Sequence, residues 1–131
     1  MAEPFTQRIA IDPGDIDELG HVNNIVYLRW AQEIAIAHWQ ARASAEMLTQ
    51  FVWVVRRHEV DYRAALQLGD EAEARTRVAP GAQGALWRRF VEIWKEGASS
   101  PCVEVASDWV LLDAATRRVK RVPPEIVSRF T

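Results

Sequence analysis

Between Asn23 and Ala45 the chain is apolar at most positions, and the few polar positions are spaced as on a helix. At about 100° per residue, these polar side chains project within about a quarter of the helix circumference. They are Arg29, Gln32, Glu33 and Gln40. Asn23 or Asn24 can cap the start of this helix. A helix that is apolar on most sides needs cover on most sides, which one curved sheet wrapped around it would provide.

Most of the other segments have the pattern of β-strands. Residues 71–78 alternate charged with small or apolar side chains, as a strand with one wet face does. Further strands are predicted at 8–12, 51–62, 85–95 and 103–112, separated by turn signals such as Pro13-Gly14-Asp15. Pro123-Pro124 ends the last strand, and residues 125–129 can add a terminal turn of helix. This order predicts an α+β fold with one helix laid on one antiparallel sheet.

Size and composition fit one globular domain over residues 1–131, since 49% of the side chains are hydrophobic and 26% are charged. The formal net charge of −2 gives no basic excess, so we expect no nucleic-acid partner. We also expect no membrane partner, because the apolar runs are too short to span a bilayer. The N-terminus lacks the pattern of a secretory signal, and the single Cys102 cannot form an internal disulfide. These features predict a cytoplasmic protein.

A lone sheet of this size has edges and one face to protect, and pairing between copies would protect an edge. We therefore expect a homo-oligomer, either a dimer or a tetramer. The six tryptophans are many for this length and indicate a well-packed core, an aromatic pocket or a subunit interface.

The segment 15–24 gathers carboxylates, a histidine and two amides directly before the apolar helix. By composition alone it would be a polar loop with a helix cap. The order of its residues, however, resembles the 4-hydroxybenzoyl-CoA thioesterase family of hotdog proteins, with plant acyl-ACP thioesterases as more distant relatives. The family pattern Asp-x-Asp-x-x-Gly-(His)-Val-Asn-Asn-x-x-Tyr is matched by Asp15, Asp17, Gly20, His21, Val22, Asn23, Asn24 and Tyr27. Weaker agreement follows at Val60-Asp61-Tyr62, Leu68-Gly69-Asp70 and Val110-Leu111-Leu112-Asp113.

The resemblance covers nearly the whole chain and implies a hotdog fold, in which one curved antiparallel sheet wraps a long central helix. It also implies an acyl-CoA thioesterase that hydrolyses an acyl-CoA or acyl-ACP thioester without a metal or another cofactor. Asp17 would then be the catalytic carboxylate, which attacks the thioester carbonyl or activates the water that does so. The backbone N–H of Asn24, near the positive end of the helix dipole, would polarise that carbonyl. Gly20 would let the loop approach the substrate closely.

The role of His21 is open. Plant acyl-ACP thioesterases place a histidine at the matching position, but they pair it with an asparagine where this chain has Leu19. His21 therefore positions water, orients Asp17 or hydrogen-bonds the loop. Asn23 fits a helix cap by its place and residue type. The motif also puts Asn23 and Tyr27 among the expected substrate-binding residues.

Other side chains give weaker signals. Another branch of hotdog thioesterases uses a helical carboxylate, but Glu33 lies four residues after Arg29, which fits an ordinary ion pair on the helix. Neither His38 nor His58 has a spacing that singles it out, and no Cys or His cluster indicates a metal site. Basic residues at a pocket mouth would suit the phosphates of coenzyme A. The candidates are the pairs Arg56-Arg57, Arg88-Arg89 and Arg117-Arg118, and among them we expect Arg56, Arg88 and Arg89 to bind substrate.

Three other functions compete with hydrolysis. Hotdog hydratases use an Asp-x-Asn-Pro-x-His motif, whereas Asp17 and His21 are one residue too close together here. A noncatalytic acyl-thioester-binding protein would keep the fold without turnover, and a purely structural oligomer would not bind acyl-CoA. Loss of thiol release in a folded Asp17→Asn variant would distinguish the enzyme from these.

Overall fold

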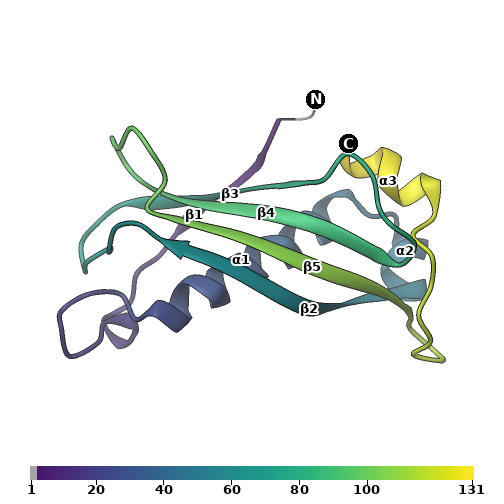
Figure 1. Ribbon diagram of the computed structural model, residues 1–131, viewed down its shortest axis with the longest axis horizontal. Coiled ribbons are helices and arrows are strands. Elements are labelled where there is room, and N and C mark those ends of the chain that lie inside the picture. The colour runs from purple at the N-terminus through teal and green to yellow at the C-terminus, as the bar shows by residue number, and fades with distance from the viewer. Residues whose placement is uncertain (1–2) are drawn as a thin grey trace.

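The computed structural model describes residues 3–131, which form a curved sheet packed against one long helix (Figure 1). The sheet consists of five strands in the order β1-β3-β4-β5-β2, and every neighbouring pair is antiparallel. The strands are β1 (Phe5–Ile9), β2 (Phe51–Tyr62), β3 (Ala72–Val78), β4 (Leu86–Lys95) and β5 (Val103–Asp113). The helices are α1 (Asn24–Arg42), α2 (Ala45–Gln50) and α3 (Pro124–Phe130), with the short 3-10 turn η1 (Pro13–Asp15) before α1. The predicted α+β fold is confirmed.

Strands β2 to β5 lie within one or two residues of the predicted ranges, because alternation and turn residues mark their ends. The first strand was predicted at 8–12 and instead spans Phe5–Ile9. Its end is set by η1, where the Asp12 N–H donates to the Asp15 carboxylate at 3.0 Å and turns the chain away from the sheet. Residues 10–12, the last three of the predicted strand, therefore lie outside the sheet.

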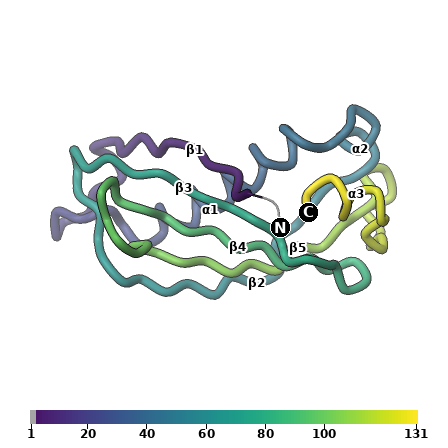
Figure 2. The backbone as a smooth tube through the Cα atoms, turned by 90° about the horizontal axis from the view of Figure 1, so that it is seen from above, coloured from purple at the N-terminus to yellow at the C-terminus, as the bar shows by residue number. Residues whose placement is uncertain are grey.

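The predicted end of the long helix near Ala45 was also too late. Helix α1 stops at Arg42, because Ala43 adopts an extended backbone conformation. Ser44 then caps the separate helix α2, since its side chain accepts a hydrogen bond from the Met47 N–H at 3.2 Å. In Figure 2, α2 and α3 lie together at one end of the molecule.

The sheet covers most sides of α1, as expected, and leaves one side uncovered. The sheet buries residues such as Tyr27, Trp30 and Ile34. Ile25 is 70% exposed, however, and Ile36 is 50% exposed. Another molecule can therefore bury these two side chains.

The core between α1 and the sheet is divided into two apolar clusters. One cluster surrounds the first half of α1 and contains Val26, Tyr27, Trp30 and Ile34. The second cluster lies at the end of the molecule that carries α2 and α3, and it contains Trp87, Leu111, Ile126 and Phe130. The side chains between these clusters are polar, and they border the candidate sites described next.

Candidate active site

The loop between η1 and α1 holds Asp17 through backbone hydrogen bonds. Ile16 and Val22 form an isolated antiparallel bridge that closes the loop. Within it, the Asp17 N–H donates to the His21 carbonyl at 2.8 Å, and the Gly20 N–H donates to the Asp17 carbonyl at 3.0 Å. Gly20 has a φ of +82°, a left-handed conformation that glycine adopts without steric cost. The glycine of the motif is therefore required by the turn itself.

The two oxygens of the Asp17 carboxylate have different surroundings. Oδ1 accepts hydrogen bonds from the backbone N–H groups of Leu19 at 2.9 Å and His21 at 3.3 Å. Within residues 3–131, Oδ2 accepts no hydrogen bond, and the side chain is half-buried. The carboxylate thus fixes its own loop through one oxygen and leaves the other free for a ligand or water.

Helix α1 begins directly after this loop. Asn23 caps the helix, since its Oδ1 accepts a hydrogen bond from the Ile25 N–H at 3.2 Å. The Asn24 N–H donates no hydrogen bond in the described part of the chain, while the Asn24 carbonyl accepts one from the Tyr62 hydroxyl at 3.1 Å. An open N–H at the positive end of a helix dipole is therefore available beside the Asp17 loop.

Tyr27 supports the loop from inside the core. It is 1% exposed, and its hydroxyl accepts a hydrogen bond from the Leu66 N–H at 2.9 Å. The Leu66 carbonyl accepts in turn from the Val22 N–H at 2.8 Å, at the base of the loop. Burial raises the pKa of Tyr27, so its hydroxyl stays neutral. In a single chain, Tyr27 contacts the protein core and is closed to a ligand.

Asp15 and Glu33 make structural ion pairs with Arg29 on α1. The Asp15 carboxylate is buried and accepts a hydrogen bond from Arg29 Nη2 at 3.0 Å. Glu33 lies 3.9 Å from Arg29 Nε, as the four-residue spacing predicts. These contacts tie α1 to the turn before the loop.

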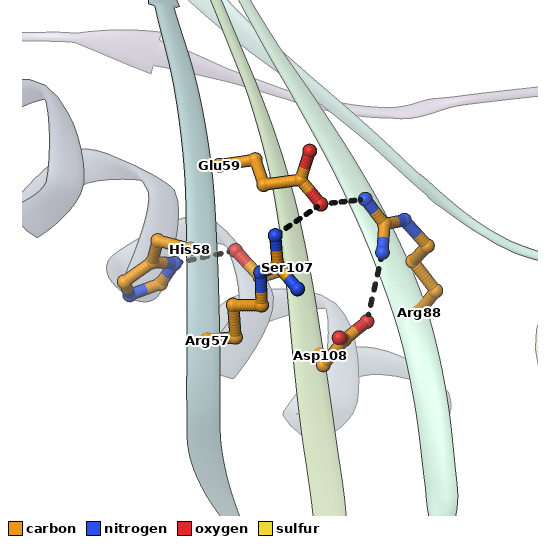
Figure 3. Close-up of polar contacts among 6 residues, drawn as sticks. All are labelled: Arg57, His58, Glu59, Arg88, Ser107 and Asp108. Atoms are coloured by element: carbon orange, nitrogen blue, oxygen red, sulfur yellow. Dashed lines mark hydrogen bonds and ion pairs between the residues drawn. The ribbon is translucent and has the colours of Figure 1, made fainter.

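The three arginines expected at a pocket mouth lie in different places. Arg56 is exposed at a register irregularity of β2, between Val55 and Arg57. Arg88 lies on the outer face of the sheet, where Nη2 donates to Glu59 at 2.6 Å and Nη1 donates to Asp108 at 3.2 Å (Figure 3). Arg89 follows on the opposite, inner face and is only 9% exposed. The structure therefore does not bring the three together.

Polar side chains separate the two apolar clusters, in an arrangement that was not predicted from the sequence. A row across three neighbouring strands is formed by His58, Ser107 and Arg89, which are paired in register. Gln32 Nε2 donates to His58 Nε2 at 3.2 Å, so His58 Nδ1 carries the proton and donates to Ser107 Oγ at 2.6 Å (Figure 3). Burial lowers the pKa of His58, which favours this neutral imidazole. In the sequence, each of these strands has one polar residue at a position that faces inward. That the three residues lie side by side follows only from the strand register.

A cavity of about 940 Å³ lies beside this row, between the second half of α1 and the start of β2. Its wall is mostly aromatic and aliphatic, and none of the described residues that line it is an Asp or Glu. Among the residues that line it are Gln32, Ile36, Val55, Trp87, Arg89 and Trp109. The volume and the apolar wall suit an acyl group. Several of the tryptophans line this cavity and thus serve as pocket walls.

The His38 imidazole is buried, and its Nδ1 accepts a hydrogen bond from Arg89 Nη1 at a distance of 2.9 Å. Burial and the neighbouring cations Arg89 and Arg42 lower the pKa of His38 from 6.5 to about 3. Between these two values the unfolded chain binds a proton that the folded chain excludes. The stability that His38 contributes is therefore complete above pH 6.5 and is lost as the pH falls toward 3.

We accordingly expect acid to weaken the fold through His38. Between about pH 6.5 and 4, the free energy of unfolding should fall by up to ~1.4 kcal/mol per pH unit from this group alone. Urea unfolding at several pH values measures the slope. The His38→Gln variant keeps a hydrogen-bond acceptor for Arg89 but has no group that titrates at this position, and His58 is unchanged. Its free energy of unfolding should therefore depend less steeply on pH than that of wild type. Equal slopes in the two proteins would contradict this assignment.

Within residues 3–131, no group of three or more His, Cys, Asp or Glu side chains is arranged to hold a metal ion. In the same part of the chain, no helix is long and apolar enough to cross a membrane.

Comparison with known families identifies similar proteins. The sequence model of the thioesterase-like superfamily matches residues 11–130. A search of curated proteins gave no match. Among solved structures, a thioesterase from Thermus thermophilus, in complex with coenzyme A and zinc, superposes with a TM-score of 0.84. Its sequence is 30% identical, and the match covers 98% of each chain.

Two further structures resemble the chain at lower identity and bear on the fold alone. The PA5185 protein from Pseudomonas aeruginosa strain PAO1 has a TM-score of 0.85 at 20% identity, over 98% of this chain and 90% of that chain. The 12:0-ACP thioesterase from Umbellularia californica has a TM-score of 0.78 at 20% identity, over 96% of this chain and 52% of that chain. Together with the strand order, the similar structures confirm the predicted hotdog fold.

Proposed function

Because the chain belongs to the thioesterase-like superfamily of thioester hydrolases, we propose that it hydrolyses an acyl-CoA or acyl-ACP thioester to a free acid and a thiol. The observation that carries this proposal is the Asp17 loop, in which one carboxylate oxygen is fixed and the other is free. The similar Thermus thermophilus thioesterase is in complex with coenzyme A, which supports a coenzyme A thioester as a substrate.

In the proposed reaction, Asp17 Oδ2 attacks the thioester carbonyl carbon or takes a proton from the water that attacks it. The carbonyl oxygen becomes negative in the transition state and accepts a hydrogen bond from the Asn24 N–H, beside the positive end of α1. When the C–S bond breaks, the thiolate leaves and takes up a proton. If Asp17 is the nucleophile, the acyl group remains on Oδ2 as an anhydride, which water then hydrolyses to release the free acid and restore the carboxylate. If water attacks, the free acid forms directly and Asp17 gives up the proton that it took. The Gly20 turn keeps the loop close to the reacting carbonyl, and the His21 imidazole positions water near it. Asn23 acts as the cap that keeps the Asn24 N–H in place.

The Asp17 loop and the cavity lie at opposite ends of β2 within one chain. The last residue of β2, Tyr62, hydrogen-bonds Asn24 at the loop, whereas residues 51–55 at the start of β2 line the cavity. Twelve residues of extended strand span roughly 36 Å from first to last. Figure 1 likewise places the loop before α1 at the end where β2 finishes, far from α2.

We therefore propose that two copies complete each other's active site. Strand β2 is at the edge of the sheet and, within residues 3–131, pairs only with β5, so its other edge is free there for a second copy. Two-fold antiparallel pairing of two β2 strands would place the end of one beside the start of the other. The Asp17 loop of one copy would then lie at the cavity of its partner. Such a dimer would also cover exposed apolar residues on this side, including Ile36 and Val54.

The carrier would bind at the mouth of this shared site. Of the three candidate arginines, Arg56 on β2 is exposed and forms no ion pair in the described part of the chain. Its guanidinium is thus available to a phosphate of coenzyme A or of phosphopantetheine. Arg88 is held in ion pairs on the outer face, and Arg89 is buried in the cavity wall.

The proposal is tested by thiol release from wild-type protein with acyl-CoAs of varied length and aromaticity, and with the same acyl groups on acyl carrier protein. Stoichiometric release of thiol and free acid is the expected result. Tight binding of several acyl-CoAs without thiol release would instead favour the noncatalytic thioester-binding function.

A further inference from the structure

The cavity wall contains one buried cation. Arg89 extends from the inner face of β4 and is 9% exposed, in a wall that is otherwise apolar or neutral. Burial lowers the pKa of Arg89 to about 10, so the guanidinium remains charged at neutral pH. A positive charge therefore lies inside the space that suits the acyl group.

No carboxylate compensates this charge within residues 3–131. Both hydrogen bonds of Arg89 leave from Nη1, to His38 Nδ1 at 2.9 Å and to Thr76 Oγ1 at 3.0 Å. Thr76 is uncharged, and His38 is neutral because it is buried beside the cations Arg89 and Arg42. Nε and Nη2 of Arg89 donate to no group in the described part of the chain.

A buried charge without a counterion is costly, and proteins ordinarily pair such groups. Arg88, the neighbouring residue on the outer face, illustrates the usual case, since it contacts both Glu59 and Asp108. Among residues 3–131, no Asp or Glu lines the cavity around Arg89. A ligand that brings an anion into the cavity would supply the missing partner.

A second unsatisfied donor lies in the same wall. The indole N–H of Trp109 is buried and has no hydrogen-bond acceptor within residues 3–131. In the β4–β5 register, Arg89 pairs with Ser107 and Trp87 pairs with Trp109, so Arg89 and Trp109 are diagonal neighbours on the inner face. Diagonal positions on adjacent strands lie about 7–8 Å apart, within reach of one carboxylate for long side chains. Both side chains thus line the same space, and the Trp109 N–H, which has no exposed surface in the chain as it stands, reaches a carboxylate there when the indole turns toward it.

We propose that this cavity binds acyl groups whose far end carries a carboxylate, which pairs with Arg89 and accepts a hydrogen bond from the Trp109 N–H. The inference deepens the proposed function and rests on it for the identity of the ligand as an acyl thioester. The preferred substrates are then mono-thioesters of dicarboxylic acids, and the aliphatic and aromatic wall contacts the chain between the two ends.

Matched substrates test this proposal in wild-type protein. The kcat/KM for thiol release is measured for adipoyl-CoA against hexanoyl-CoA, and for sebacoyl-CoA against decanoyl-CoA. At least one ω-carboxyacyl member should exceed its neutral partner on the order of 10- to 100-fold, the range of one charge-assisted hydrogen bond or ion pair. Preference for the neutral member in both pairs would overturn the proposal.

Variants of the cavity residues test which side chains cause the preference for ω-carboxyacyl substrates. Arg89→Met removes the cation but keeps an unbranched side chain, and it should abolish the preference for the ω-carboxyacyl substrate. Trp109→Phe should weaken the preference while Arg89 stays in place, so the test survives if Arg89→Met fails to fold. The control is Arg77→Met, since Arg77 is an exposed arginine on the next strand, packed over Phe90, and should leave the preference unchanged. An unaltered preference in both cavity variants would overturn the assignment.

Binding measurements separate this inference from the proposed reaction. Calorimetric titration with free adipate or sebacate, against hexanoate or decanoate, requires no turnover. Tighter binding of the diacid without hydrolysis of any thioester would mean that the cavity assignment holds and the proposed function fails. Hydrolysis of neutral thioesters without diacid binding would mean the reverse.

Discussion

Replacement of Asp17 by asparagine is expected to lower kcat for thioester hydrolysis on the order of 10³-fold, while the protein remains folded. The amide oxygen of asparagine can still accept the hydrogen bonds that Leu19 and His21 donate to Oδ1. The loop should therefore keep its conformation, and only the free carboxylate oxygen loses its nucleophilic and basic character. Steady-state thiol release, with urea unfolding of the same samples, measures both effects.

The matched control for this change is Glu18→Gln, which removes the adjacent, exposed carboxylate. Its kcat should remain within a few-fold of wild type. If Asp17→Asn is equally active, the carboxylate is not the catalyst, and His21 and Glu33 become the residues to test next.

Filling the cavity is expected to be the second large effect. Val55 lies on the inner side of β2 and lines the cavity, whose volume of about 940 Å³ can accept a larger side chain. Val55→Trp should lower kcat/KM about 10- to 100-fold for long or aromatic acyl groups, because the added ring occupies their space. Acetyl-CoA should be affected much less, since its acyl group needs little of the cavity.

The control for the cavity variant is Val110→Trp, which adds the same ring on the outer face of β5. It should leave the acyl preference as in wild type. Equal losses for short and long acyl groups in Val55→Trp would mean that the cavity does not bind the acyl chain.

The fold was predictable because its signals are local. The apolar stretch with a narrow polar stripe marks α1, and alternation with turn residues marks the strands. The loop around Asp17 could be expected from the motif, the Asn23 cap from its place and residue type, and the Arg29–Glu33 pair from the four-residue spacing. All of these depend on neighbours within a few residues. The split between α1 and α2 was missed because Ser44 competes as a cap inside an otherwise helical pattern.

The polar row and the cavity could not be predicted, because they depend on contacts between distant segments. His58, Ser107 and Arg89 come from three strands, and only their register places them side by side. For the same reason Arg89 was expected at a phosphate-binding mouth: the sequence does not say that its side chain faces inward while that of Arg88 faces outward. The same holds for Tyr27, since its partner Leu66 lies 39 residues away.

If Asp17 of one copy acts at the cavity of another, two inactive variants should complement each other within one dimer. Asp17→Asn and Val55→Trp chains carrying different tags are co-expressed, and hybrid dimers are purified through both tags. Each hybrid contains one site with an intact Asp17 loop from one chain and an intact cavity from the other, so about half of wild-type activity on a long acyl-CoA should return. Hybrids as inactive as the two parent variants would mean that the loop and the cavity act within a single chain, or not together at all.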